Sequence, residues 1–420
     1  MACRVRWPVL LALLLAGAQT AQAYSVLTHE EVIDLLWKDE LRPILLTRFP
    51  GATPAQLRLA HAYAYGGSLI QDIGYYPFGS GFFSDLTHYV RTGDFVQNLL
   101  RESSDMNEYA FALGAMAHYA SDIAGHPTIN SVVAMTFPCL RAQYGKHVTY
   151  EDDPKAHIRV EFGFDLVQVA KDRFTSDNYH DFIGFEVAKP LLERAFFDTY
   201  GLHLEDVIGH VDLAIETFRR AVSEVIPEMT RVALVWKRLD LVKETPNFNA
   251  RKFRYYLSRA QYEREWGRHY RRPGFVARVL AFCLRWVPKI GPLKAMAFVI
   301  PTNQTEDMYI RSMDLTREQY KQLLVSLREG HLRLPNMDLD TAEPPRVGEY
   351  ELTDETYARL LREHEKRGFQ FVLPELRANI VVFYRNLDVP VPTHKQVKAW
   401  RTGLIELKKL RSESAVGGSR

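Results

Sequence analysis

The chain has 420 residues, with 53 Lys+Arg against 51 Asp+Glu, and 47% of its residues are hydrophobic. This length is sufficient for two domains or for one elaborated domain with a large core. Only three cysteines are present, so the protein is not a disulfide scaffold, and no fixed-period repeat or low-complexity tract is visible. Whether Cys139 and Cys283 pair stays open from the sequence.

Residues 1–23 have the features of a secretory signal peptide. Two arginines precede the apolar run Trp7–Ala18, and Ala21-Gln22-Ala23 matches an A-x-A cleavage site. The apolar run is too short to span a bilayer comfortably. We therefore expect cleavage near Ala23, a processed chain that begins at Tyr24, and a protein that is secreted or exported to the periplasm.

The spacing of apolar residues predicts a chain made mainly of helices. Thr53-Pro54 supplies a cap and first turn for one helix, and Thr316 with Gln319 forms a capping box before another. Phe369–Leu373 is the one candidate strand, and residues 335–348 are expected to form a surface loop. Besides the helices that carry the motifs below, we expect helices over residues 30–41, 53–70, 181–198, 204–223, 250–270, 316–329, 354–367, 374–387 and 394–410.

Charge is concentrated between residues 251 and 294. This stretch holds twelve Lys/Arg and two acidic residues, with aromatic residues among them. Basic residues mixed with aromatics favour an anionic surface, either lipid headgroups or a phosphate backbone. The alternative is that the aromatics belong to the core and the arginines to a solvated rim. Lys and Arg residues with Pro288 and Pro292 interrupt its most apolar part, so no transmembrane helix is expected there.

Two histidine motifs have the spacing of metal ligands. His118, Asp122 and His126 form H-x3-D-x3-H, and His157 with Glu161 forms H-x3-E. On a helix, residues four apart lie on one face about 5–6 Å apart, close enough to share a metal ion. The apolar segment before His118 predicts a buried helix, which we expect to end near Gly125. A lone histidine on such a helix is usually a core residue, whereas two such motifs favour metal binding.

The candidate ligands outnumber those that one zinc ion can use. Imidazole and carboxylate suit zinc, which takes four protein ligands in a structural site and fewer in a catalytic one. The ligand set has no cysteine, which argues against a zinc finger, and the absence of H-E-x-x-H argues against a standard metalloprotease. We therefore expect two or three zinc ions. The eight candidate side chains are His29, Asp72, His88, His118, Asp122, His126, His157 and Glu161.

The order of these residues resembles the zinc-dependent phospholipase C family, related in fold to single-strand-specific nucleases. The resemblance covers about residues 24–165 and implies a multi-helix bundle. It also implies that the free N-terminal residue, here Tyr24, is a ninth ligand. The family usually shows H-x3-D-x5-H and starts with Trp. The shorter second gap in this chain is similar to that of the catalytic domain of glycosylphosphatidylinositol-specific phospholipase D.

The resemblance also implies how three zinc ions are shared. One ion would be bound by Asp72, His88, His118 and Asp122, and a second by His126, His157 and Glu161. Tyr24 and His29 would hold the third, with Asp122 bridging. Two ions about 3.5–4 Å apart can stabilise the attacking and leaving oxygens of a phosphodiester. Asp72 is the candidate catalytic residue that orients or deprotonates the water, the alternative being a purely ligating role.

The aromatic, glycine-rich segment 74–83 follows Asp72 and precedes His88, so it is expected beside the metals. As a substrate wall it would take an acyl-glycerol edge or stack on a base, and the alternative is packing under the helices. The candidate substrate-binding residues are Tyr75, Tyr76, Phe78, Phe82 and Phe83.

These observations predict a secreted zinc-dependent phosphodiesterase that hydrolyses phospholipids, of type C or D, by metal-activated water. A single-strand-specific nuclease on the same scaffold is one alternative, and a non-catalytic, zinc-stabilised surface-binding protein is another. The expected partner is a phospholipid or membrane surface, with nucleic acid for the nuclease; no protein partner is inferred. We expect a catalytic domain over residues 24–230 and a helical C-terminal extension of unknown role over 231–420.

Overall fold

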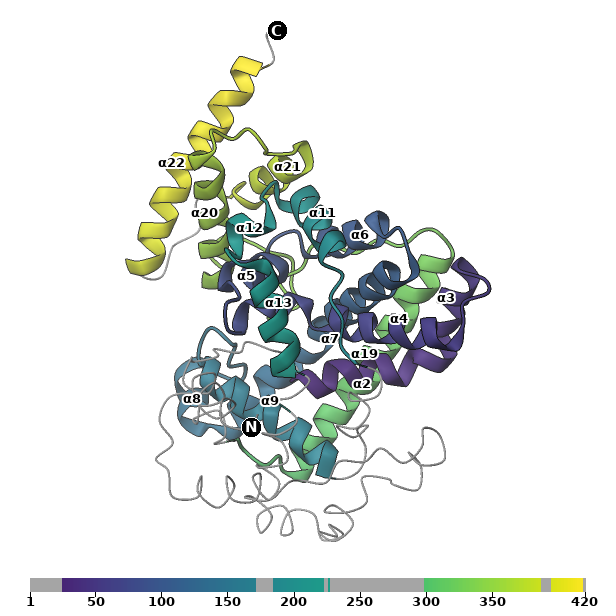
Figure 1. The fold of residues 1–420 in the computed structure, drawn as a ribbon. Helices are drawn as coiled ribbons and strands as arrows, with labels where there is room; N and C mark the ends of the chain where they lie inside the picture. Colours follow the sequence, from purple (N-terminus) through teal and green to yellow (C-terminus); the bar gives the residue numbers. More distant parts are fainter. Residues whose placement is uncertain (1–24, 171–183, 223–225, 227–297, 387–393, 418–420) are drawn as a thin grey trace, which may run out of the picture.

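The computed structural model describes residues 25–170, 184–222, 226, 298–386 and 394–417, and the statements below concern these residues (Figure 1). The predicted signal peptide, Tyr24, Cys283 and the basic stretch 251–294 lie outside them. The described chain is almost wholly helical, with one antiparallel bridge between Asp338 and Glu343 as its only strand-like pairing. The prediction of a mainly α fold is confirmed.

The elements, in chain order, are α2 (Val26–Leu36), the π-helical turn η1 (Trp37–Leu41), α3 (Arg42–Arg48), α4 (Pro54–Ser68), the 3₁₀ turn η2 (Ile70–Tyr75), α5 (Gly81–Tyr89), α6 (Thr92–Glu102), α7 (Met106–Thr136), α8 (Pro138–Tyr144), α9 (Pro154–Ala170), α11 (Lys189–Tyr200), α12 (Leu204–Val207), α13 (Val211–Arg220), α19 (Asn303–Arg328), α20 (Glu351–Lys366), α21 (Pro374–Phe383) and α22 (His394–Gly417). None of these helices is long and apolar enough to cross a membrane.

Helix α7 is the centre of the bundle and is buried along most of its length. Asp105 caps its start by accepting hydrogen bonds from the backbone N–H groups of Asn107 and Glu108. The expectation that this helix ends near Gly125 was wrong, because it continues past Pro127 to Thr136. Buried apolar residues in its last turns pack against neighbouring elements. Their burial outweighs the cost of a glycine and a proline in the helix.

Helices α4 and α7 lie unusually close together because glycines face the partner backbone. A Cβ on Gly114 would be 2.1 Å from the carbonyl oxygen of Ala64, and one on Gly67 would be 1.9 Å from that of Phe111. Only glycine fits at such a contact. This packing fixes the end of α4, and hence η2 with Asp72, beside the middle of α7.

Helix α19, although it follows the family-like segment by about a hundred residues, packs directly on α7 and α2 (Figure 1). The hydroxyl of Tyr320 donates to the backbone carbonyl of Leu113, at 2.8 Å. The predicted capping box at Thr316 was wrong, because Thr316 lies mid-helix and donates to the carbonyl of Ser312. The helix begins after Thr302, whose side chain accepts from the N–H of Thr305.

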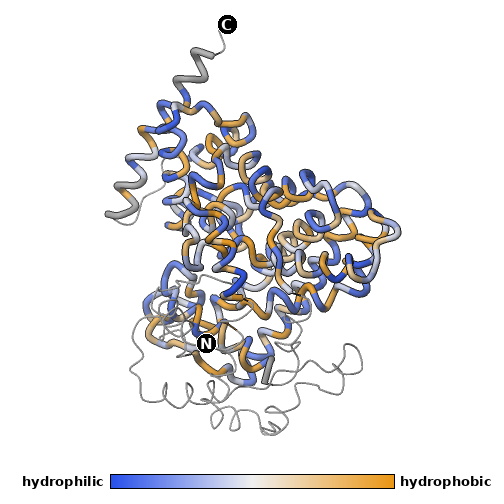
Figure 2. Tube along the Cα trace, in the orientation of Figure 1, coloured by the Kyte–Doolittle hydropathy of each residue, from blue (hydrophilic) through white to orange (hydrophobic). Residues whose placement is uncertain are grey.

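At the other end of the molecule α20 packs on α22, with α21 beside them in Figure 1. Hydrophilic and hydrophobic residues alternate along these outer helices, as expected where one face meets the core (Figure 2). The predicted strand at Phe369–Leu373 was wrong. Phe369 has a φ of 54° and donates its N–H to the carbonyl of His364, so it forms a turn after α20.

The segment between α19 and α20, predicted to be a surface loop, lies only partly on the surface. Its centre, Asp338 to Asp340, is buried, with Leu339 fully enclosed. The N–H of Leu339 donates to the carbonyl of His88 at 3.0 Å. The Asp338 carboxylate accepts from the N–H groups of Asp340 and Thr341, so the turn satisfies its own polar groups and can be buried.

Candidate metal centre

Predicted ligands from four separate elements meet in the core of the bundle. Each of them is at most 2% exposed, although they are spread over nearly one hundred positions of the sequence. Helix α2 contributes one, η2 one, α5 one, and α7 three on a single face. In that order they are His29, Asp72, His88, His118, Asp122 and His126.

The donor atoms of the first five are spaced as ligands of a metal ion. Nε2 of His118 lies 3.0 Å from Asp122 and 3.4 Å from Nε2 of His88. Nε2 of His88 is 3.4 Å from Asp72, and His29 is 3.6 Å from Asp122. Two ligands about 2.0–2.1 Å from one tetrahedral zinc are about 3.3 Å apart. Two overlapping triples, His29–His118–Asp122 and Asp72–His88–His118, each have the arrangement needed for one ion.

Backbone carbonyls set the orientation of two of the rings. Nδ1 of His88 is 2.7 Å from the carbonyl oxygen of Ser84, and Nδ1 of His118 is 2.9 Å from that of Ser68. In the neutral rings these nitrogens carry the proton and donate it, so both Nε2 atoms present lone pairs to the cluster. These lone pairs repel one another and repel the two nearby carboxylates. A cation bound between them would remove that repulsion.

The carboxylates of the cluster give a second indication of whether these residues suit a metal ion. Among the residues that the structure describes, no donor hydrogen-bonds either oxygen of Asp72 or of Asp122. A buried carboxylate without donors is costly unless it binds a metal or is paired. The residues present therefore fit a buried metal centre, and the set of imidazoles and carboxylates suits zinc.

The pKa shifts of the cluster residues reflect their burial and their closeness to one another. Burial raises the pKa of Asp72 and lowers that of His29, in the latter case assisted by the neighbouring His118. Burial acts against ionisation of His88, but the carboxylates of Asp122 and Asp72 outweigh it and raise the pKa of His88 well above its usual value. Without a metal, a proton on His88 would replace part of the missing positive charge.

Of the remaining predicted ligands, His126 lies beside the first cluster, and His157 pairs with Glu161. Nε2 of His126 is 4.0 Å from Asp122. Nδ1 of His157 is 3.3 Å from Glu161, while its Nε2 is 2.6 Å from the carbonyl oxygen of Val148. Burial and the nearby Asp340 raise the pKa of Glu161 well above its usual value, which identifies an uncompensated carboxylate.

Asp340 is a site residue that the sequence analysis missed. Its Oδ1 is 3.2 Å from Nε2 of His126, and its side chain is buried. The sequence offered only a weak signal, two aspartates at Asp338 and Asp340 in a segment rich in turn residues. Nothing in that pattern connects it to a histidine motif more than two hundred residues earlier.

The start of α2 is held close to α9, which carries His157 and Glu161. Asp165 on α9 accepts hydrogen bonds from the N–H of Leu27 and the hydroxyl of Thr28. Burial raises the pKa of Asp165 to about 6. Tyr24 lies outside the described residues, so its ligation stays a prediction.

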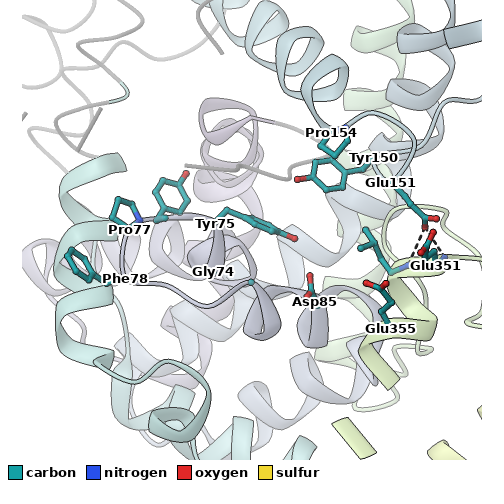
Figure 3. Close-up of a pocket in the computed structure, with 13 residues that line it drawn as sticks. Gly74, Tyr75, Pro77, Phe78, Asp85, Tyr150, Glu151, Pro154, Glu351 and Glu355 are labelled. Carbon is teal, nitrogen blue, oxygen red and sulfur yellow. Dashed lines mark hydrogen bonds between the residues drawn. The ribbon is translucent and has the colours of Figure 1, made fainter. Parts of the chain in front are cut away.

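A cleft of about 640 Å³ opens beside the centre, lined by η2, the segment after it, the start of α9 and the start of α20 (Figure 3). Tyr75, Asp85 and Tyr150 surround its interior, and the Tyr75 ring is 6.1 Å from that of His88. Burial raises the pKa of Asp85 to about 7. Glu151, Glu351 and Glu355 also line the cleft, and no Lys or Arg of the described residues lines it.

Of the predicted substrate-binding residues, Tyr75, Tyr76 and Phe78 line this cleft. Phe82 and Phe83 instead lie in the core. Phe83 stacks on Phe196, and the Arg359 guanidinium lies over the Phe82 ring at 4.1 Å. The two residues begin α5, whose helical turn directs them inward, away from the aromatic loop.

The described residues form a mainly helical fold with a buried histidine–carboxylate cluster that could hold metal ions, beside a cleft. Residues 28–209 match the family model described as zinc dependent phospholipase C. No curated protein and no solved structure matches the chain. The match ends well before α19 and the segment that contains Asp340.

Proposed function

We propose that the protein is a secreted, zinc-dependent phosphodiesterase that hydrolyses phospholipids. The observation that supports this most directly is the cluster of buried carboxylates and lone-pair nitrogens, without donors of their own, beside an open cleft. The domain of the zinc-dependent phospholipase C family supports the same activity.

The proposed ligands of the first ion are Asp72, His88, His118 and Asp122. His126, His157 and Glu161 serve the second, and Tyr24 and His29 serve the third with Asp122 bridging. Zinc lowers the pKa of a bound water towards about 7 and stabilises charge on phosphoryl oxygens. Asp72 is the proposed group that orients the attacking water and accepts its proton, because its carboxylate is buried in the cluster and has no hydrogen-bond donor among the described residues.

The cleft favours a lipid with a cationic head group. Carboxylates of Asp85 and Glu355 and the rings of Tyr75 and Tyr150 surround one space (Figure 3). Such a wall attracts an ammonium group through charge and through cation–π contacts. The same wall repels a polyanion such as DNA, so a single-strand nuclease is the less favoured function. Choline or ethanolamine phospholipids are therefore the proposed substrates.

The test compares phosphatidylcholine, phosphatidylethanolamine and phosphatidylinositol micelles with denatured DNA, using protein stripped of metal and then reloaded with zinc. We expect hydrolysis of the first two lipids only, and only after reloading. Release of diacylglycerol identifies type C cleavage, and release of phosphatidic acid identifies type D. Cleavage of DNA without cleavage of lipid would support the nuclease. No hydrolysis of any diester by fully loaded protein would support a binding protein.

Asp85→Asn tests the head-group proposal separately. At pH 8, above the raised pKa of Asp85, it removes one negative charge from the cleft and none from the proposed ligand set. We expect KM for the cationic lipids to rise about tenfold while zinc content stays that of the wild type. The matched control is Glu375→Gln, an exposed carboxylate on α21, for which we expect wild-type KM. Equal KM for Asp85→Asn and wild type contradicts the head-group assignment.

A further inference from the structure

The segment 331–350, which joins α19 to α20, is fixed to two helices of the candidate metal centre. The N–H of Leu339 donates to the carbonyl of His88 on α5 at 3.0 Å. The side chain of Asn130 on α7 donates to the carbonyl of Asp340 at 3.1 Å. The backbone on each side of the Asp340 side chain is therefore held by elements that carry proposed ligands.

The two carboxylate oxygens of Asp340 have different partners. Oδ2 accepts hydrogen bonds from the hydroxyls of Tyr89, at 2.8 Å, and Tyr350, at 2.6 Å. Oδ1 faces Nε2 of His126 at 3.2 Å. The phenols orient the carboxylate but are neutral, so they supply no charge to balance it. A carboxylate that is 2% exposed needs a cation or a proton at the other oxygen.

The orientation of the His126 ring decides between two roles for Asp340. A carboxylate that orients a ligating histidine binds the nitrogen that does not face the metal. Here Asp340 faces Nε2, the same nitrogen that lies 4.0 Å from Asp122 in the first cluster. The other nitrogen, Nδ1, has no hydrogen-bond partner among the described residues. Oδ1 of Asp340 and Nε2 of His126 are therefore 3.2 Å apart, close to the spacing of about 3.3 Å between two ligands of one tetrahedral zinc.

From this geometry we propose that Asp340 is a ligand of the metal ion bound by His126. The ligand comes from outside the part of the chain that matches the family model, which ends at residue 209. The proposal rests on the metal centre of the proposed function and adds a carboxylate to its second ion. The ion is then bound by side chains from two parts of the chain separated by about 180 residues.

The test is the zinc affinity of Asp340→Asn in the full processed chain. The amide keeps the size and one acceptor oxygen, but it is a poor zinc ligand. Loss of an orienting partner typically lowers metal affinity by about 10–100-fold. We expect a competition titration with a chromophoric chelator to show one site weakened by more than about 100-fold, with elemental analysis showing one zinc fewer per chain.

The matched control is Asp354→Asn. Asp354 is a buried carboxylate whose oxygens accept from the N–H of Gly348 in the same segment, so the change disturbs the segment without removing a proposed ligand. We expect this variant to keep the zinc content of the wild type. Zinc affinities for Asp340→Asn within 100-fold of the wild type at every site overturn the proposal. Wild-type protein that binds no zinc overturns the proposed function as well.

Hydrogen exchange of the wild type keeps the proposal testable if Asp340→Asn does not fold. Removing zinc should speed exchange of the amides of residues 337–342, whereas α21, which contains no proposed ligand, should exchange at an unchanged rate. Exchange of residues 337–342 that is the same with and without zinc overturns the proposal.

Discussion

At the scale of single residues, Asp122 has the largest number of contacts to other candidate ligands. Its two oxygens lie 3.6, 3.5 and 3.0 Å from nitrogens of His29, His88 and His118. Burial opposes its ionisation, but these histidines, His118 first, lower the pKa of Asp122 well below the usual value. The residue therefore stays a carboxylate and can bridge two cations.

We predict that Asp122→Asn loses zinc and activity together. Removing a bridging carboxylate takes away several kcal/mol of charge stabilisation, which corresponds to a fall in kcat/KM on the order of 10³-fold or more. The measurements are elemental analysis and the rate of phosphatidylcholine hydrolysis. The control is His147→Ala, an exposed histidine that contacts Ser131, which should leave both unchanged. Full zinc content in Asp122→Asn would contradict a bridging role.

The sequence was sufficient to recognise His118, Asp122 and His126, because a helix places residues four apart on one face whatever the rest of the fold does. It was not sufficient for Asp340. The hydrogen bond between Asn130 and Asp340 joins positions 210 residues apart. The position of Asp340 therefore depends on how α19 packs, which local patterns do not reveal. Local patterns also could not show that Phe82 and Phe83 lie in the core while the aromatic residues before them line the cleft. The direction of these two side chains depends on where α5 begins.

At the scale of elements, the glycine contacts between α4 and α7 position η2 and Asp72. Contacts between elements also explain two wrong predictions, the end of α7 and the start of α19. Both were based on local signals for helix ends, and tertiary burial of the continuing helix outweighed them. The helix starts at Thr53 and Asp105 depend on side-chain caps, and the cap at Thr53 was predicted from the sequence.

We predict that Gly114→Ala destabilises the protein. The added Cβ would lie 2.1 Å from the Ala64 carbonyl oxygen, so α4 must move away from α7. Overpacking of this kind lowers the free energy of unfolding by about 1–3 kcal/mol, which urea denaturation can measure. The control is Gly209→Ala, because no atom lies within 4 Å of its added Cβ. Equal stability of Gly114→Ala and wild type would contradict the close approach.

Glu151 links the start of α20 to the loop before α9 and makes stability depend on pH. Its carboxylate accepts from the N–H groups of Glu351 and Leu352, and burial raises its pKa to about 7 from a usual 4.5. The folded chain therefore retains a proton that the unfolded chain loses between these values. The corresponding stabilisation is complete below about pH 4.5 and is lost as the pH rises through about 7.

We expect the free energy of unfolding of the wild type to fall more steeply from pH 4.5 to pH 8 than that of Glu151→Gln, which cannot titrate. Urea denaturation at intervals across this range measures both. Glu375→Gln, an exposed change, should follow the wild type. Parallel curves for Glu151→Gln and wild type would show that Glu151 has no raised pKa.

At the scale of the whole molecule, residues of α19 and of the segment after it help to build the core around the part of the chain that matches the family model. Tyr320 contacts the backbone of α7, Tyr309 forms a hydrogen bond with Thr28 at 2.7 Å, and Asp340 reaches His126. The predicted division into a domain over 24–230 and an extension over 231–420 stays a prediction. These three contacts cross the predicted boundary. They could not be predicted from local sequence patterns, because they join residues that are far apart in the chain.

We predict that removing zinc lowers the melting temperature by several degrees. Without the ions, the carboxylates of Asp72 and Asp122 stay buried with less positive charge around them, and the binding energy that favours the folded state is lost. Differential scanning calorimetry before and after treatment with a chelator measures the change, and adding zinc should reverse it. The same chelator loaded beforehand with zinc is the control. An unchanged melting temperature would mean that the folded chain gains nothing from zinc.

The hydrogen bond between Leu339 and His88 has a consequence for when the protein becomes active. Ribosomes and export machinery deliver a chain from its amino end, and the segment with Leu339 and Asp340 arrives among the last. Until then the proposed second ion lacks a ligand and the carbonyl of His88 lacks the N–H of Leu339. For the exported phosphodiesterase proposed above, a half-delivered chain would therefore not hydrolyse the lipids it passes, and hydrolysis would begin only in the compartment that receives the finished molecule.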